Sequence, residues 1–242
     1  MNTTPQPPEG TIPIAYRVAR ARWGGAALAL GVVLYMTAIV LFVTLYGPPE
    51  GTGPGGGVTL ADTAAHMHAR WNLVRGLWCT ELIGALLIGL AASLLQHRRQ
   101  TGLYWLPASV AWITVAVGAS ILTVMYTITL GSYPPALAAF QEQPAIFAAL
   151  RGGMGSAFYV GMATMFLGLA GAFLAEALAT DTVLARWFAF VGTAVSLLAT
   201  GRWIAMFAGF TGQLSPALGL TAFLLAGVFG LSIFRGNRET AL

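Results

Sequence analysis

The chain has 242 residues, of which 57% are hydrophobic and only 8% are charged. An ordinary soluble domain carries about a quarter charged residues, so this composition excludes a soluble globular protein and predicts helices in lipid. All twelve basic residues are arginine, which excludes a retinal protein with a lysine Schiff base, and their scatter along the loops argues against a nucleic-acid partner.

The N-terminal segment is rich in proline, and we predict a flexible tail over residues 1–16. Residues 17–242 are expected to form a single transmembrane domain. Its first apolar run, 23–46, is too long for a signal-peptide core and ends at Gly47-Pro48-Pro49 rather than at a small-residue cleavage site. We therefore expect a first span that is retained in the protein.

A second unit follows the Gly/Pro-rich stretch 47–57, which is expected to be an external loop. The pattern Thr59-x-x-Asp62 is typical of a capping box and predicts the start of an external amphipathic helix. This helix can run without interruption into a second span at 76–96. A short basic turn is expected at 97–99.

Four further spans are predicted from apolar runs between turn signals. The third, at 104–130, is closed by Tyr133-Pro134-Pro135. Segment 136–150 is too short and too polar to cross, so we expect a second external helix there. The last three spans are expected at 153–178, 185–207 and 216–234. The predicted fold is an all-α, polytopic transmembrane bundle of about six spans, with external amphipathic helices before spans 2 and 4.

The arginine positions predict how the bundle is oriented. With the N-terminus inside the cell, four arginines fall toward the outside, namely Arg70, Arg75, Arg151 and Arg202. The cytoplasmic side then holds twice as many: Arg17, Arg20, Arg22, Arg98, Arg99, Arg186, Arg235 and Arg238. The positive-inside rule therefore favours a bacterial inner-membrane protein with both termini in the cytoplasm.

Two ionisable residues are expected within the bilayer. Glu81 and Arg202 lie at similar depths near the outer ends of the second and fifth spans, and we predict that they are close or share a water-filled pocket. The commoner explanation of such a pair is structural, since it fixes helix register; a proton, ion or substrate site is the alternative. Glu176 and Asp181 are expected to be hydrated at the cytoplasmic end of the fourth span.

A polar stripe is expected on the helix that starts at Thr59. Asp62, His66 and Arg70 share one helical face with Glu81, because residues four apart lie above one another in an α-helix. The stripe can line an access path to Glu81, or it can be solvated or face a partner subunit. Asp62 and His66 are also the weak candidates for a metal site, because imidazole with carboxylate suits Zn or Cu.

No cofactor is predicted. None of the three histidines lies in a predicted span, which argues against haem and pigment ligation, while lipid or quinone contact stays open. Small residues at four-residue spacing, such as Ala157 with Gly161 and Gly168 with Ala172, permit close approach of helices.

A resemblance to a bacterial family lies in three segments: Trp71-Asn72-Leu73-Val74-Arg75-Gly76-Leu77 followed by Glu81-Leu82, the basic turn at 97–99, and Arg186-Trp187. They resemble an uncharacterised family of six- to seven-helix membrane proteins, a domain of unknown function. The similarity covers most of the chain and concerns hydropathy and turn placement. It implies a helical membrane fold and no known activity, so no residue role follows from it.

Three functional hypotheses are compatible with these patterns. The leading one is a non-catalytic membrane subunit or accessory protein that packs against other membrane proteins, because no convergent catalytic set is present. The alternative is a small transporter or channel-like protein that uses Glu81 and Arg202. A second alternative is a periplasmic-face metal-handling protein or membrane enzyme centred on Asp62 and His66. The expected partners are membrane lipids and other subunits or further copies of the chain.

Overall fold

The computed structural model describes residues 14–47, 58–96, 98, 105–180, 182–210 and 217–236. Within these ranges the chain forms helices and no strand. The elements are α1 (Ile14–Leu41), the π-helical turn η1 (Phe42–Tyr46), α2 (Leu60–Ala69), α3 (Trp71–Leu95), α4 (Trp105–Ala138), α5 (Pro144–Leu178), α6 (Arg186–Phe207) and α7 (Ala217–Gly236).

Six stretches of helix are long and apolar enough to cross a membrane: α1 with η1, α3, α4, α5, α6 and α7. Large apolar side chains such as Leu30, Val117 and Leu197 stay exposed along them. That surface suits contact with acyl chains, and helices satisfy their own backbone hydrogen bonds in lipid. The predicted fold class, a polytopic helical membrane bundle, is therefore confirmed.

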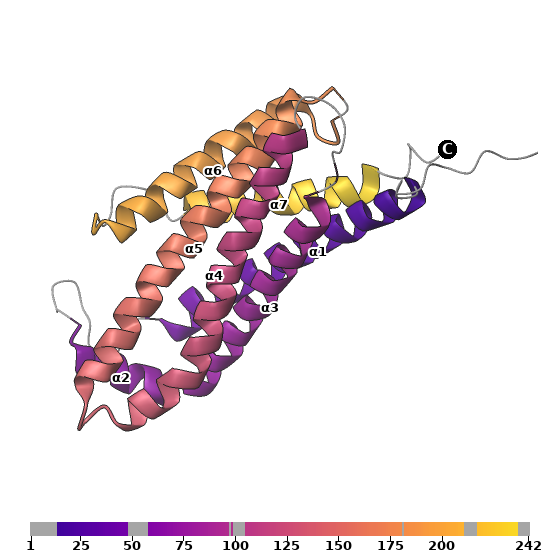
Figure 1. The fold of residues 1–242 in the computed structure, drawn as a ribbon. Coiled ribbons are helices and arrows are strands. Elements are labelled where there is room, and N and C mark those ends of the chain that lie inside the picture. The colour runs from indigo at the N-terminus through magenta and orange to yellow at the C-terminus, as the bar shows by residue number, and fades with distance from the viewer. Residues whose placement is uncertain are drawn as a thin grey trace, which may run out of the picture.

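The spans run alongside one another (Figure 1), and their contacts follow a closed order, which we call the ring of spans. α1 packs on α3 and α7, α4 packs on α3 and α5, and α6 packs on α5 and, over a shorter stretch, on α7. Aromatic rings of α7 fill the enclosed space. Phe223 packs against Tyr35 of α1 and Phe166 of α5. Phe229 packs against Trp112 of α4, so the core lies along the axis of the ring.

Close contacts between neighbouring spans occur at glycine. A Cβ atom added to Gly84 of α3 would lie 2.9 Å from the carbonyl oxygen of Gly31 on α1. One added to Gly168 of α5 would lie 2.5 Å from the backbone nitrogen of Val115 on α4, and one added to Gly161 would meet the side chain of a leucine on α4. Glycine therefore lets the helix backbones touch, which is the packing role predicted for Gly161 and Gly168.

The helix that follows Thr59 is interrupted rather than continuous. Thr59 caps α2 through the predicted capping box with Asp62. At Arg70, however, the backbone has φ −109° and ψ 17°, which ends α2 before α3 starts at Trp71.

The prolines at 134 and 135 do not close the third span. α4 continues through them to Ala138, and both Tyr133 and Leu137 of this last turn are buried. A proline inside a helix removes a backbone hydrogen bond, and here the buried side chains hold the turn against the bundle despite that loss.

The external helix expected at 136–150 is not a separate element. A turn occupies 139–142, and α5 starts at Pro144 and runs without a break into the fourth span. Proline is favoured at the first helical position because the N–H it lacks would have no partner there.

Some expectations concern residues outside the described ranges. α1 starts at Ile14, so the end of the predicted tail is helical, whereas residues 1–13 are not described. Further residues considered above also lie outside the described ranges. They are most of the predicted external loop, 48–57, and the residues His97, Arg99, Tyr104, Asp181 and Arg238.

Candidate functional site

Glu81 lies on the inward face of α3. Residues three or four apart share a face of a helix, and the neighbours Val74, Leu77 and Ile88 on this face are all buried. Glu81 is only 6% exposed. The periodicity that buries the apolar residues of α3 therefore also carries a carboxyl group into the bundle.

Two tyrosine hydroxyls accompany this carboxyl group. The side chain of Tyr126 on α4 forms a hydrogen bond with Glu81. Its hydroxyl oxygen lies 2.9 Å from that of Tyr35 on α1. The Tyr35 hydroxyl also donates to the sulfur of Met162 on α5, at 3.8 Å. We call Glu81, Tyr126 and Tyr35 the central carboxyl site.

The central carboxyl site has no counter-charge among the described residues. Glu81 forms its hydrogen bond with Tyr126, whose hydroxyl in turn meets that of Tyr35, and the ion pair formed between two described residues joins Arg98 to Glu176 instead. A tyrosine hydroxyl offers a hydrogen bond but no positive charge. Because a buried charge is stable only when it is neutralised or paired, the site is suited to hold a proton or a small cation.

Tyr35 and Tyr126 are not singled out by the sequence analysis. Tyrosine is typical of the ends of spans, where its ring lies at the interface. These two residues instead stand well inside α1 and α4. A hydroxyl in the middle of an apolar span needs a polar partner, so mid-span tyrosine is the signal that could have found them.

The structure does not bring Glu81 and Arg202 together. α3, which carries Glu81, packs on α1 and α4, whereas α6, which carries Arg202, packs on α5 and α7. The guanidinium carbon of Arg202 lies 5.5 Å from the ring centroid of its neighbour Trp203. Similar depth in the bilayer does not mean proximity, because the position of each helix around the ring of spans also decides which side chains meet.

His66 and Arg70 bind the end of the first span. The Nε2 atom of His66 lies 3.0 Å from the carbonyl oxygen of Tyr46. Arg70 donates to the carbonyl oxygens of Leu45, at 2.6 Å, and of Tyr46, at 3.2 Å. The last carbonyls of a helix lack partners within it, so these two side chains cap η1. An additional role of the stripe as an access path stays a prediction.

Asp62 takes part in the cap of α2. Its Oδ2 atom accepts hydrogen bonds from the hydroxyl of Thr59, at 2.6 Å, and from the Thr59 backbone N–H, at 3.0 Å. These hydrogen bonds lower the pKa of Asp62 below its ordinary value. The bond from the Thr59 side chain has the larger effect, and the bond from the Thr59 backbone adds to it. A metal ion at Asp62 would compete with this cap. The described part of the chain contains no group of three His, Cys, Asp or Glu side chains that could hold a metal.

A buried ion pair closes the opposite end of the bundle. Nη1 of Arg98, which follows α3, lies 2.9 Å from Oε2 of Glu176 near the end of α5. The other carboxylate oxygen accepts a hydrogen bond from the backbone N–H of Val183. Glu176 is 1% exposed, so the expectation of a hydrated carboxylate is wrong.

Aromatic rings lie between the central carboxyl site and the α2 end of the bundle. The ring of Trp78, three residues before Glu81, packs edge-on against Tyr133 of α4 at 5.2 Å between centroids. Tyr133 also packs against Phe147 of α5 and stacks with Trp71. We call Trp71, Trp78, Tyr133 and Phe147 the aromatic plug.

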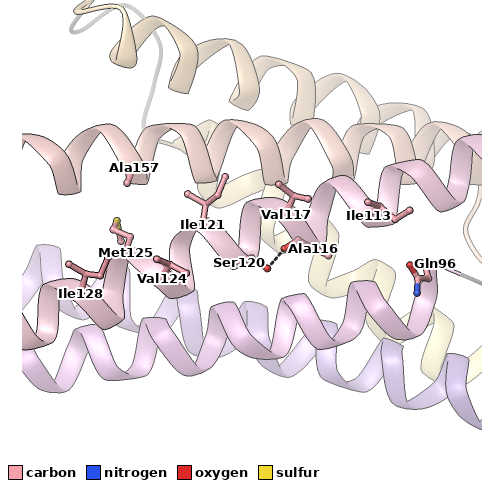
Figure 2. A pocket seen from close by; sticks show the side chains of 10 residues that line it. All are labelled: Gln96, Ile113, Ala116, Val117, Ser120, Ile121, Val124, Met125, Ile128 and Ala157. Carbon is pink, nitrogen blue, oxygen red and sulfur yellow. Dashed lines mark hydrogen bonds between the residues drawn. The ribbon is translucent and has the colours of Figure 1, made fainter.

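An apolar groove of about 600 Å³ runs along α4. Figure 2 shows the side chains that line it. Most of its lining comes from α4, including Ile113, Val117 and Val124, with Ala157 of α5 opposite and Gln96 at one end. These α4 side chains are exposed on a spanning helix, so the groove faces the acyl chains of the bilayer. The expected lipid or quinone contact stays a prediction.

Comparison of the chain with models of protein families, with curated proteins and with solved structures gave no match. The resemblance to an uncharacterised membrane family therefore stays a prediction. The functional argument depends on the geometry of this chain alone.

Proposed function

We propose that this multi-pass membrane protein is a small carrier that moves a solute or ion across the bilayer and binds a proton or cation at Glu81 as it does so. The burial of Glu81 against two tyrosine hydroxyls carries the proposal, because the described residues supply it with no basic partner. A structural ion pair, the commoner explanation of a carboxylate in a span, needs a basic partner, and none of the residues that the structure describes provides one for Glu81.

Two kinds of neutralising partner fit the central carboxyl site. A proton converts the carboxylate into a neutral carboxyl group, which exchanges hydrogen bonds with Tyr126 and through it with Tyr35. A small hard cation would instead take oxygen ligands from the carboxylate and the hydroxyls. In either case the tyrosines orient Glu81 and extend its hydrogen bonding from α3 to α1. Uptake and release of a charge at such a residue is a common basis of ion-coupled transport.

Closed contacts on both sides of the central carboxyl site support a carrier over an open channel. The aromatic plug lies toward α2, and the Arg98–Glu176 pair ties together the turns at the other end. A carrier alternates between opening at one end and opening at the other. In this proposal the aromatic plug and the Arg98–Glu176 pair are the two contacts that open in turn.

We further propose that both termini lie in the cytoplasm and that the membrane is the bacterial inner membrane. Contacts between helix ends indicate that several arginines gather at the same end of the bundle. Arg20 on α1 donates to the carbonyl oxygen of Ser93 near the end of α3, and Arg98 meets Glu176. Arg186 reaches the carbonyl oxygen of Ala179 in the same group of turns. The positive-inside rule assigns this end to the cytoplasm.

The test is charge movement in proteoliposomes after a rapid pH or cation jump, recorded on a solid-supported membrane. The protein is expected to give a transient current that Glu81→Gln removes. Glu142→Gln is the matched control, because Glu142 is exposed in the turn between α4 and α5. The proposal is overturned if Glu81→Gln gives a current as large as that of the unmodified protein. It is also overturned if the unmodified protein gives no current after either a pH jump or a cation jump.

A second candidate is a subunit that packs against another membrane protein, and one observation favours it. Gly152, Gly153 and Gly155 on α5 have no atoms of the chain within 4 Å of an added Cβ, unlike the glycines buried between spans. An open glycine surface lets a partner helix approach closely. Gly153→Leu should then abolish a complex that survives gentle extraction on native gels. Gly201→Leu on α6, also at an open position, is the control.

A further inference from the structure

The first and last spans meet along a tight contact. The start of α1 lies beside the end of α7 (Figure 1). A Cβ atom on Gly25 of α1 would lie 2.5 Å from the carbonyl oxygen of Gly230 on α7. This contact fixes the backbones of α1 and α7 relative to each other. The side chains that follow it toward the arginine-rich end therefore have fixed positions relative to one another.

Three arginines at this end have no acceptor within the described chain, and two of them, Arg22 and Arg235, lie where α1 meets α7; the third, Arg17, is exposed near the start of α1. The guanidinium carbon of Arg22 lies 5.3 Å from the ring centroid of Phe234 on α7, and its buried Nε atom has no hydrogen-bond partner. Arg235, next to Phe234, is exposed. Arg20, Arg98 and Arg186 at the same end differ, because each donates to a carbonyl or carboxylate oxygen.

Each of these two arginines stands at the end of an apolar stripe that faces outward. On α7, Leu224, Val228 and Leu231 are exposed and precede Arg235 at helical spacing of three or four residues. On α1, Val33 and Val40 are exposed on the helical face that Arg22 begins. A cationic head above two apolar stripes matches a molecule with an anionic head and two long apolar chains.

We propose that the contact between α1 and α7 binds an anionic phospholipid. Its phosphate lies between Arg22 and Arg235, and its acyl chains follow the stripes on α1 and α7. Guanidinium groups bind phosphate through paired N–H donors, and the Nε of Arg22 is one such donor without an acceptor. This site is separate from the central carboxyl site and does not depend on transport.

Native mass spectrometry of the full chain tests the site. The probes are phosphatidylglycerol and phosphatidylcholine with identical acyl chains, added to the protein in detergent. The protein is expected to retain phosphatidylglycerol preferentially. Arg22→Gln and Arg235→Gln should each lower that preference roughly fivefold, since one arginine near a lipid surface contributes about 1 kcal/mol.

Arg75→Gln is the control. Arg75 is exposed near the start of α3, at the opposite end of the spans from the proposed site at the start of α1 and the end of α7. An unchanged preference in the Arg22→Gln/Arg235→Gln double variant, or an equal loss in Arg75→Gln, overturns the proposal. Thermal unfolding of each variant is measured in parallel. If the double variant does not fold, Arg235→Gln alone decides. Arg22→Lys/Arg235→Lys keeps both charges but loses the paired N–H donors, so it should show a preference between those of the unmodified protein and of Arg22→Gln/Arg235→Gln.

Discussion

The hydroxyl oxygens of Tyr35 and Tyr126 lie 2.9 Å apart, and this contact joins α1 to α4 across the interior of the ring of spans. Their ring planes meet at 67° with centroids 6.4 Å apart, so the hydroxyls meet while the rings pack edge-on. Because Tyr126 also bonds to Glu81 and Tyr35 bonds to Met162, one hydrogen-bonded chain connects four spans, α3, α4, α1 and α5.

The first prediction concerns the hydroxyl that joins Glu81 to Tyr35. Tyr126→Phe leaves Glu81 without this hydrogen-bonding partner and leaves the Tyr35 hydroxyl with the sulfur of Met162 alone, so the free energy of unfolding should fall by about 1 to 3 kcal/mol. SDS titration in mixed micelles measures this change. Tyr16→Phe, at an exposed tyrosine, should have no effect. A Tyr126→Phe protein as stable as the unmodified one would show that this hydroxyl contributes no net hydrogen bonding.

The second prediction concerns the contact of α1 with α3. A Cβ on Gly84 would press on the carbonyl oxygen of Gly31, so Gly84→Ala should lower the free energy of unfolding by about 1 to 3 kcal/mol. Gly76→Ala on the same helix is the matched control, because its added Cβ meets nothing. It should leave stability unchanged or raise it slightly through helix propensity. Equal effects of the two substitutions would refute the close contact.

The third prediction concerns the buried ion pair. Glu176→Gln removes the charge that neutralises Arg98, and loss of one partner of a buried pair is expected to destabilise by about 3 to 5 kcal/mol. A double-mutant cycle with Arg98→Gln measures the coupling between the two residues. A coupling energy near zero would mean that Arg98 and Glu176 do not stabilise the turns jointly.

The fourth prediction concerns acid. The hydrogen bonds from Thr59 lower the pKa of Asp62 in the folded protein, so they stabilise the start of α2 at neutral pH. This stabilisation should be lost as the pH falls through the lowered pKa of Asp62, and amide hydrogen exchange across 60–69 should then speed up. In Asp62→Asn, exchange after correction for intrinsic rates should lose this pH dependence. The same dependence in both proteins would place the titrating group elsewhere.

The spans could be predicted from sequence because hydropathy and turn signals act locally. The capping box at Thr59 and Asp62 is local too, and it forms. Helix limits were less predictable where tertiary contacts act. Arg70 breaks the helix while its side chain caps η1, and buried neighbours carry α4 past Pro134. Neither contact is visible in a pattern of neighbouring residues.

The candidate site was half predictable for the same reason. A carboxylate in an apolar span marks Glu81 from sequence alone. Its partners depend on which helices are neighbours in the ring of spans, and the sequence patterns do not contain that order. Arg202 was the partner expected from depth, whereas Tyr126 is the partner found. The burial of Glu176 likewise depends on Arg98, which reaches it from a different turn.

The central claim is that Glu81 exchanges a proton or cation within the bilayer during transport. It is tested most directly by labelling the protein in liposomes with an apolar carbodiimide. Peptide mass spectrometry measures the labelled fraction of Glu81, and the pH-jump current is recorded on the same samples. The account predicts an adduct at Glu81 and a current that falls in proportion to the labelled fraction. An undiminished current after complete labelling of Glu81 would contradict it.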